Sequence, residues 1–116
     1  MAIDTESPAY KWYIRHVKWF QDKDVAGLLA SDYTADAILM SYDFRVQGAA
    51  GLTYAFTQYL DLVGGFTFTT EQFHATPTEV ILEATLQTEK AGVRKVWDVF
   101  TLENGKISRH FTGLKG

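Results

Sequence analysis

Apolar side chains recur every three or four residues in the N-terminal half of the chain, which is the spacing of amphipathic helices. Ser7 and Pro8 suit a helix start, because serine can cap a helix and proline fits its first turn. The spacing predicts a helix over residues 9–21 with these side chains on one face: Tyr10, Tyr13, Ile14, Val17 and Phe20. A second stripe of Trp12, His16 and Trp19 lies beside them, so we expect this helix to be largely enclosed.

Further elements follow at shorter intervals. Asp24 can cap a second helix, and Gly64 and Gly65 can end a third one. The pattern therefore predicts a helix over residues 25–30, a strand over 35–42, a loop over 43–47 and a helix over 48–63.

The C-terminal half alternates apolar and polar positions, as half-buried strands do. Asn104 and Gly105 give the clearest turn signal, since Asn-Gly favours a tight hairpin. The predicted strands cover residues 66–74, 79–88, 93–102 and 107–114. Helices first and strands last predict an α+β domain, with the helices on one face of a curved antiparallel sheet.

The composition is that of an ordinary globular domain. The chain has 116 residues, of which 47% are hydrophobic and 22% charged, so we expect residues 1–116 to form a single domain. The net charge of −3 lacks the basic character of nucleic-acid binders, which excludes a nucleic-acid partner. The absence of cysteine excludes disulfides, zinc–thiolate sites and thiol nucleophiles.

The start of the chain is polar and acidic, unlike a secretory signal. No apolar run approaches the ~20 residues that cross a bilayer. We therefore expect no membrane partner and a cytoplasmic location. The unusual figure is the aromatic content of 15%, from 8 Phe, 6 Tyr and 3 Trp. So many rings must build the core, line a cavity or form an interface.

Four sequence segments, in this order, carry a resemblance to a known family: FQDKDVAGLLASDYTADAILM, VQGAAGL, VWDVFTLENGKI and SRHFTG. Through them, about residues 8–114 resemble the nuclear transport factor 2-like (NTF2-like) superfamily, in its SnoaL-like and ketosteroid-isomerase-like branch. The resemblance implies a cone of the cystatin-like type, in which a strongly curved antiparallel sheet wraps a long N-terminal helix. It also implies a pocket for small, mostly apolar molecules. Members range from isomerases, cyclases, dehydratases and epoxide hydrolases to binding modules.

Asp98 is the leading candidate for chemistry. Strand alternation places it on one face with Val96 and Phe100, so a carboxylate stands among apolar side chains. The resemblance implies a pocket aspartate here, which donates to an oxyanion in the isomerases and acts as the base in SnoaL-type cyclases. The alternative is an exposed aspartate, or one satisfied by the backbone or by a histidine.

The histidines are the next candidates. The resemblance aligns His16 with a pocket tyrosine of the isomerases, where it would donate a hydrogen bond or carry a proton; the alternative is a surface position. A normally paired last hairpin brings His110 near Asp98, which would make an acid–base couple. We expect His74 on the surface. The histidines lack metal-ligand spacing, so we expect no metal and no cofactor.

At two positions the chain lacks a side chain that a specific activity of the superfamily requires. Ser41 stands where the resemblance places the catalytic aspartate of the isomerases, and Asp43 substitutes for it only if the strand end bends inward. Val96 stands where the epoxide hydrolases carry an arginine, and Arg94 lies one alternation further along. Neither steroid-type isomerisation nor epoxide hydrolysis is therefore expected.

The remaining candidates would bind the ligand or a second copy of the chain. We expect the pocket wall to include Tyr13, Trp19, Ser41, Tyr42, Phe56, Tyr59, Phe66, Phe68, Val96 and Phe100. If Asp98 faces inward, Trp97 and Val99 face outward, which predicts a homodimer through that sheet face.

Three functions stay open. The first is an isomerase, cyclase or lyase that uses Asp98 for proton transfer on a small apolar molecule, assisted by His16 or His110. The second is a non-catalytic ligand-binding or dimerisation module of the same fold. The third is a subunit that binds another protein through its sheet face.

Overall fold

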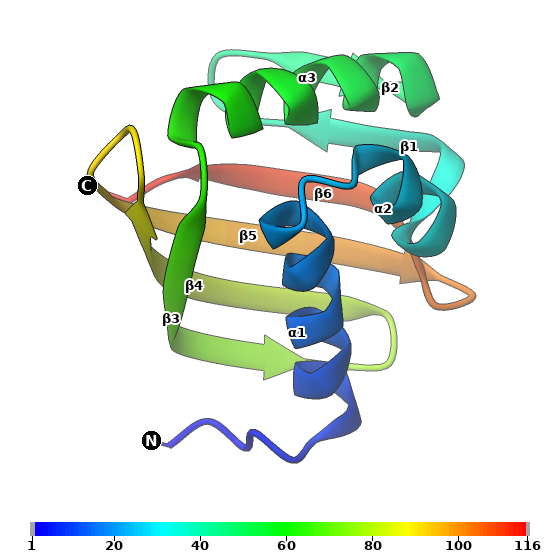
Figure 1. Cartoon of the computed structure of the whole chain (residues 1–116). Helices are drawn as coiled ribbons and strands as arrows, with labels where there is room; N and C mark the ends of the chain where they lie inside the picture. The colour runs from blue at the N-terminus through cyan, green and yellow to red at the C-terminus, as the bar shows by residue number, and fades with distance from the viewer. Residues whose placement is uncertain (1, 116) are drawn as a thin grey trace.

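The computed structural model describes residues 2–115, which form three helices on one side of a curved six-stranded sheet (Figure 1). The elements in chain order are α1 (Pro8–Gln21), α2 (Val25–Asp32), β1 (Tyr33–Met40), β2 (Arg45–Gln47), α3 (Gly48–Val63), β3 (Phe66–Ala75), β4 (Glu79–Thr88), β5 (Val93–Glu103) and β6 (Lys106–Leu114). The α+β class and every predicted helix and strand are confirmed, with bounds that differ by two residues or fewer.

The long helix α1 crosses the concave side of the sheet (Figure 1). Its start is capped as predicted, since the Ser7 hydroxyl accepts a hydrogen bond from the amide of Tyr10. One side of α1 is buried, but Lys11, Arg15 and Lys18 on the other side are exposed. The expectation of a largely enclosed helix was therefore wrong, because the sheet and the other helices cover only one side of α1. None of the described helices combines the length and apolarity needed to span a membrane.

The sheet runs in the order β2-β1-β6-β5-β4-β3. All neighbouring strands are antiparallel except β1 and β6, which are parallel. The predicted antiparallel sheet is confirmed apart from this pair, where α3 and four strands intervene before the chain returns to β1. Part of the predicted loop 43–47 is the short edge strand β2, whose three residues are too few to show a period. Bulges in β3 and β6 accompany the bend of the sheet.

The tight turn between β5 and β6 confirms the Asn-Gly signal. Asn104 and Gly105 both have positive φ, 52° and 79°, as a two-residue turn of the favoured hairpin type requires. The turn pairs the residues next to it, and a bulge at Ser108 of β6 then shifts the register by one residue, so that Phe100 faces His110 and Asp98 faces Thr112. All four side chains consequently point to the concave side of the sheet.

Phe100 stands at the centre of the core and is 1% exposed. Its ring contacts those of Trp12 and His16 on α1, with centroid distances of 5.7 and 5.2 Å. It also contacts the ring of His110 at 4.5 Å. The core thus joins α1 to the middle of the sheet through aromatic rings.

Candidate functional site

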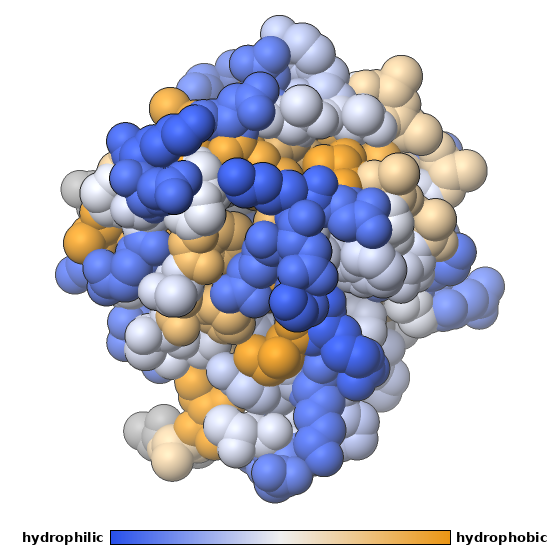
Figure 2. All heavy atoms as spheres, viewed as in Figure 1, coloured by the Kyte–Doolittle hydropathy of each residue, from blue (hydrophilic) through white to orange (hydrophobic). Residues whose placement is uncertain are grey.

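A cavity of about 390 Å³ lies between α1, α3 and the concave face of the sheet. Its wall consists mainly of aromatic and aliphatic side chains with a few polar groups, the usual composition of a small-molecule site. Four lining residues are exposed and mark its rim: Asp43, Phe44, Leu62 and Leu114. On the face that Figure 2 shows, hydrophobic surface flanks the hydrophilic outer side of α1.

Most of the side chains predicted for the pocket do line this cavity. They are Tyr13, Ser41, Phe56, Tyr59, Phe66, Phe68, Val96 and Phe100 for the wall, with Asp98, His16 and His110 for the chemistry. They come from α1, α3 and four strands or their ends, so the fold collects them from the whole length of the chain. His74 is exposed, as expected, and takes no part in the cavity.

Tyr42 and Trp19 do not line the cavity, which corrects two of the predicted wall positions. Tyr42 is 88% exposed, because β1 ends at Met40 and strand alternation does not continue to residue 42. Its ring instead lies 5.8 Å from that of Trp97, on the outer side of the sheet. Trp19 packs against Gly27 of α2, where the absent side chain leaves room for the indole ring.

Asp98 is held in the cavity by a chain of hydrogen bonds from β6 and β1. Its Oδ1 lies 2.7 Å from Nε2 of His110, and Nδ1 of His110 lies 2.9 Å from the Tyr33 hydroxyl. Burial, with the nearby Asp98 second, raises the pKa of Tyr33 well above its ordinary value, so Tyr33 keeps its hydrogen. Tyr33 can then donate to Nδ1, while Nε2–H donates to the carboxylate. The predicted Asp98–His110 couple is present in the structure.

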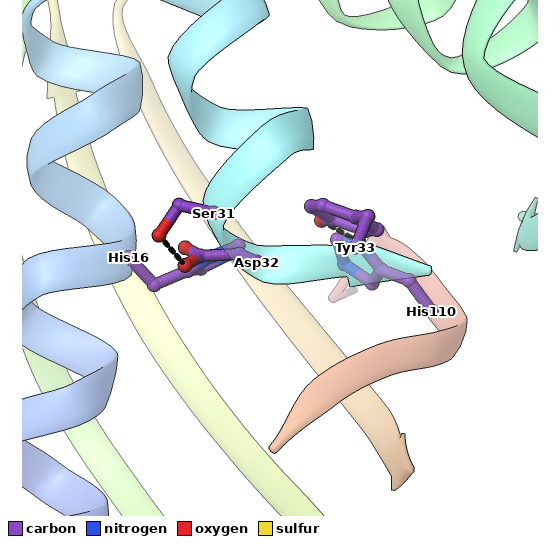
Figure 3. A network of polar contacts seen from close by, with 5 residues as sticks. All are labelled: His16, Ser31, Asp32, Tyr33 and His110. Carbon is purple, nitrogen blue, oxygen red and sulfur yellow. Dashed lines mark hydrogen bonds and ion pairs between the residues drawn. The ribbon is translucent and has the colours of Figure 1, made fainter. Parts of the chain in front are cut away.

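His16 forms a second buried pair, with Asp32 at the end of α2 (Figure 3). Its Nδ1 lies 2.8 Å from Oδ2 of Asp32, and the Ser31 hydroxyl donates to Oδ1 of the same carboxylate over 2.8 Å. His16 is 2% exposed and lines the cavity, which excludes the surface alternative. With Nδ1–H donating to Asp32, Nε2 makes no hydrogen bond to another described residue and remains an acceptor.

Burial lowers the pKa of His16 from its ordinary value of 6.5, and the bond to Asp32 opposes this only in part. The folded protein therefore holds His16 neutral at pH values where the unfolded chain already binds a proton. As the pH falls below about 6.5, the free energy of unfolding should decrease, by at most about 1.4 kcal/mol per pH unit for this one group. The decrease ends where folded His16 also becomes protonated.

We expect a His16→Asn variant to remove this contribution, since its amide can donate to Asp32 but does not titrate. Urea unfolding at several pH values between 5 and 7.5 measures the slope. The control is His74→Asn, an identical change at an exposed position, which should leave the slope as in the wild type. An unchanged slope in His16→Asn would contradict the assignment of a neutral, buried imidazole.

Asp32 and Tyr33 were missed by sequence reasoning. Asp32 carried a signal, because a carboxylate in the last turn of a helix is unfavourable next to the negative end of the helix dipole. Such a residue indicates a partner, which here is His16. Nothing in the sequence near Tyr33 indicated its role, since its partner His110 lies 77 residues away.

Arg94 is a further polar group of the cavity wall, from the start of β5. Its Nε atom is buried and has no hydrogen-bond partner among the described residues. The guanidinium carbon lies 5.6 Å from the centre of the Tyr59 ring. Burial raises the pKa of Tyr59, although the charge of Arg94 opposes this shift, so Tyr59 keeps its hydrogen. In the part of the chain that the structure describes, no three histidine or acidic side chains are grouped as metal ligands.

The sequence and the fold of the chain are similar to those of known proteins. A family model described as the SnoaL-like domain matches residues 13–110. The chain belongs to the SnoaL-like family. The matched range of this SnoaL-like domain begins in α1 and ends in β6, so it contains both His–Asp pairs. A search of the curated proteins found no significant match.

Solved structures share the fold of this SnoaL-like domain at low sequence identity. A proposed polyketide cyclase from Sinorhizobium meliloti is 13% identical, with 97% of this chain and 100% of that one covered and a TM-score of 0.78. TerC, co-crystallised with polyporic acid, is 17% identical, with 94% and 92% covered and a TM-score of 0.76. A protein of ketosteroid isomerase-like fold from Catenulispora acidiphila, in complex with trimethylamine, is 9% identical, with 88% and 83% covered and a TM-score of 0.73. These matches establish the NTF2-like fold.

Proposed function

We propose that this SnoaL-like domain binds a small, largely apolar molecule in its cavity and transfers a proton on it, as an isomerase, cyclase or lyase does. The observation that carries the proposal is the position of Asp98. One oxygen of this carboxylate is bound to His110, and the other makes no hydrogen bond to a described residue within an apolar cavity. The polyporic acid of TerC and the trimethylamine of the Catenulispora protein support a small-molecule ligand.

In the proposed reaction, the free oxygen of Asp98 takes a proton from a carbon of the ligand. His110 holds the other oxygen, and Tyr33 holds His110, so the carboxylate keeps one orientation. A positioned general base contributes roughly 10²- to 10⁴-fold to a rate. The charge left on the ligand needs hydrogen-bond donors inside the cavity.

Two tyrosines of the wall suit that second task. Burial is the largest cause that raises the pKa of both Tyr13 and Tyr59, so both side chains remain hydroxyl donors at neutral pH. A hydroxyl in a dry cavity stabilises a developing oxyanion more strongly than water does. His16 can assist, because its neutral Nε2 can take up a proton and return it to another atom of the ligand. Loss of proton transfer in an Asp98→Asn variant is the direct test.

A non-catalytic binding or dimerisation module is the second candidate, and two observations favour it. Ser41 lines the cavity where the resemblance to the isomerases calls for a carboxylate base. The outer face of the sheet also carries an apolar row. Met40, Phe111, Val99 and Ile81 lie in register across four adjacent strands.

We propose that this row forms a homodimer interface together with Trp97 and Tyr42. Ile81 and Met40 are 52% and 39% exposed, which is unfavourable for such side chains in a single copy. The row crosses the middle of the sheet, where an isologous interface between two copies can bury it.

A Val99→Lys variant should be monomeric if this interface exists, because a charge at the centre of a buried apolar patch is costly. Sedimentation velocity measures the mass of wild type and variant at equal concentrations. Thr67→Lys places the same charge on an exposed position of β3, outside the row, and should leave the dimer intact. A monomeric wild type, or a dimer that persists in Val99→Lys, would contradict the proposed interface.

A further inference from the structure

Arg94 is the only lysine or arginine among the described residues that line the cavity. The cavity also contains the carboxylates of Asp98 and, at the exposed rim, Asp43. Arg94 makes no ion pair with either of them, nor with any other described residue. A single positive charge therefore faces the cavity without an ion-pair partner among the described residues.

The surroundings of Arg94 leave most of its hydrogens, including the one on Nε, available to a ligand. Tyr59 lies against the guanidinium: its ring can stabilise the charge by a cation–π contact, and its hydroxyl interacts with one guanidinium N–H, which leaves the other four N–H groups for a ligand. The buried Nε–H has no acceptor among the described residues. Buried donors in native proteins are nearly always satisfied, so an unsatisfied one on a cavity wall points to an acceptor that the ligand supplies.

Arg94 and Asp98 lie on the same inward face of β5, separated by Val96. Their backbone positions are four residues apart, which is about 13 Å along an extended strand. An apolar segment of wall therefore separates a group that can bind an anion from the proposed base. This spacing suits a ligand with an acidic group at one end and the reacting carbon at the other.

We propose that Arg94 binds a carboxylate of the ligand, so that the substrate class is a carboxylic acid carried on a compact apolar body. A guanidinium presents two parallel N–H groups that match the two oxygens of a carboxylate. One cation balances one carboxylate, whereas a phosphate dianion would leave an extra negative charge in a cavity that already contains the carboxylates of Asp43 and Asp98. This inference rests on the proposed function only in taking the cavity as the ligand site.

The test compares two probes of nearly equal shape, 2-naphthylacetate and its neutral amide, 2-naphthylacetamide. Isothermal titration calorimetry gives the affinity of each probe for the intact protein. The wild type should prefer the acetate by about ten- to a hundredfold, since the carboxylate makes charge-assisted hydrogen bonds. Arg94→Gln should abolish that preference by weakening acetate binding while leaving amide binding within about threefold.

Two further variants separate recognition from general effects. Arg94→Lys keeps the charge but loses the planar pair of donors, so it should retain only part of the preference. Arg109→Gln removes a charge from the exposed outer face of the sheet and should change neither affinity. Equal binding of the two probes to the wild type, no binding of either, or equal losses for both probes in Arg94→Gln would overturn the proposal.

Failure of this inference can be distinguished from failure of the proposed reaction. Asp98→Asn should keep the preference for the acetate, because the carboxylate is bound at the other end of the cavity. If that variant retains proton transfer while Arg94 selects the acetate, only the catalytic role of Asp98 is wrong. If Asp98→Asn loses proton transfer and the wild type shows no preference, only the role of Arg94 is wrong.

Discussion

An Asp98→Asn variant is expected to lose proton abstraction by roughly 10²- to 10⁴-fold while keeping its fold. Asparagine has nearly the same shape as aspartate, and its carbonyl oxygen can still accept the hydrogen bond from His110. It cannot take up a proton at neutral pH, so only the base is removed. Ring opening of 5-nitrobenzisoxazole is a suitable assay, because this reaction needs only a positioned base and gives a coloured product.

Asp43→Asn is the matched control for this measurement. Asp43 also lines the cavity, but it is exposed at the rim and belongs to neither His–Asp pair. The control should therefore keep the rate of the wild type. Turnover in Asp98→Asn that equals the wild type, or a wild type no faster than acetate buffer, would favour the binding module over the enzyme. Loss of the rate in Asp43→Asn alone would identify Asp43, at the rim of the cavity, as the base.

A Phe100→Ala variant is expected to lower the free energy of unfolding by about 3–5 kcal/mol. The side chain is 1% exposed, and it contacts Trp12, His16 and His110 at once. Its removal leaves a cavity that the surrounding rings cannot fill without giving up their own contacts. Small domains have only about 5–15 kcal/mol of stability in total, so this loss is a large fraction of it. Equilibrium unfolding in urea measures the change.

Phe44→Ala is the corresponding control, since Phe44 is 42% exposed at the rim of the cavity. The same atoms are removed, but fewer of them leave a buried contact, so the loss should stay well below that of Phe100→Ala. Similar losses at both positions would mean that Phe100 is not the centre of the core. The comparison needs no knowledge of the ligand.

The helices and strands could be predicted from the sequence because most of them carry a local signal. Ser7 with Pro8 marks the start of α1, and Asn104 with Gly105 marks the final hairpin. The parallel pairing of β1 with β6 was not accessible in this way, since pairing between distant strands depends on how the whole sheet packs. The edge strand β2 was missed for the opposite reason, as three residues carry no period.

The candidate site could be predicted from the sequence only in part. The last hairpin predicted that His110 lies near the strand of Asp98, but the bulge at Ser108, which turns His110 to the same face as Asp98, carried no signal in the sequence. The resemblance, and not the pattern, directed attention to His16, and its partner Asp32 was overlooked. Tyr42 was misplaced because the end of β1 was set two residues too late, and one residue decides which face of a sheet a side chain occupies.

The position of β6 has a consequence for how the protein is made. This strand is the last element of the described chain, yet it lies in the middle of the sheet, between β1 and β5. During synthesis, β1 and the β3–β5 meander emerge first, and no strand can join them into one sheet until β6 leaves the ribosome. Tyr33 cannot form its hydrogen bond to His110 until 77 further residues have been synthesised. Completion of the sheet and formation of the Tyr33–His110 hydrogen bond therefore both require β6, the last of the described strands.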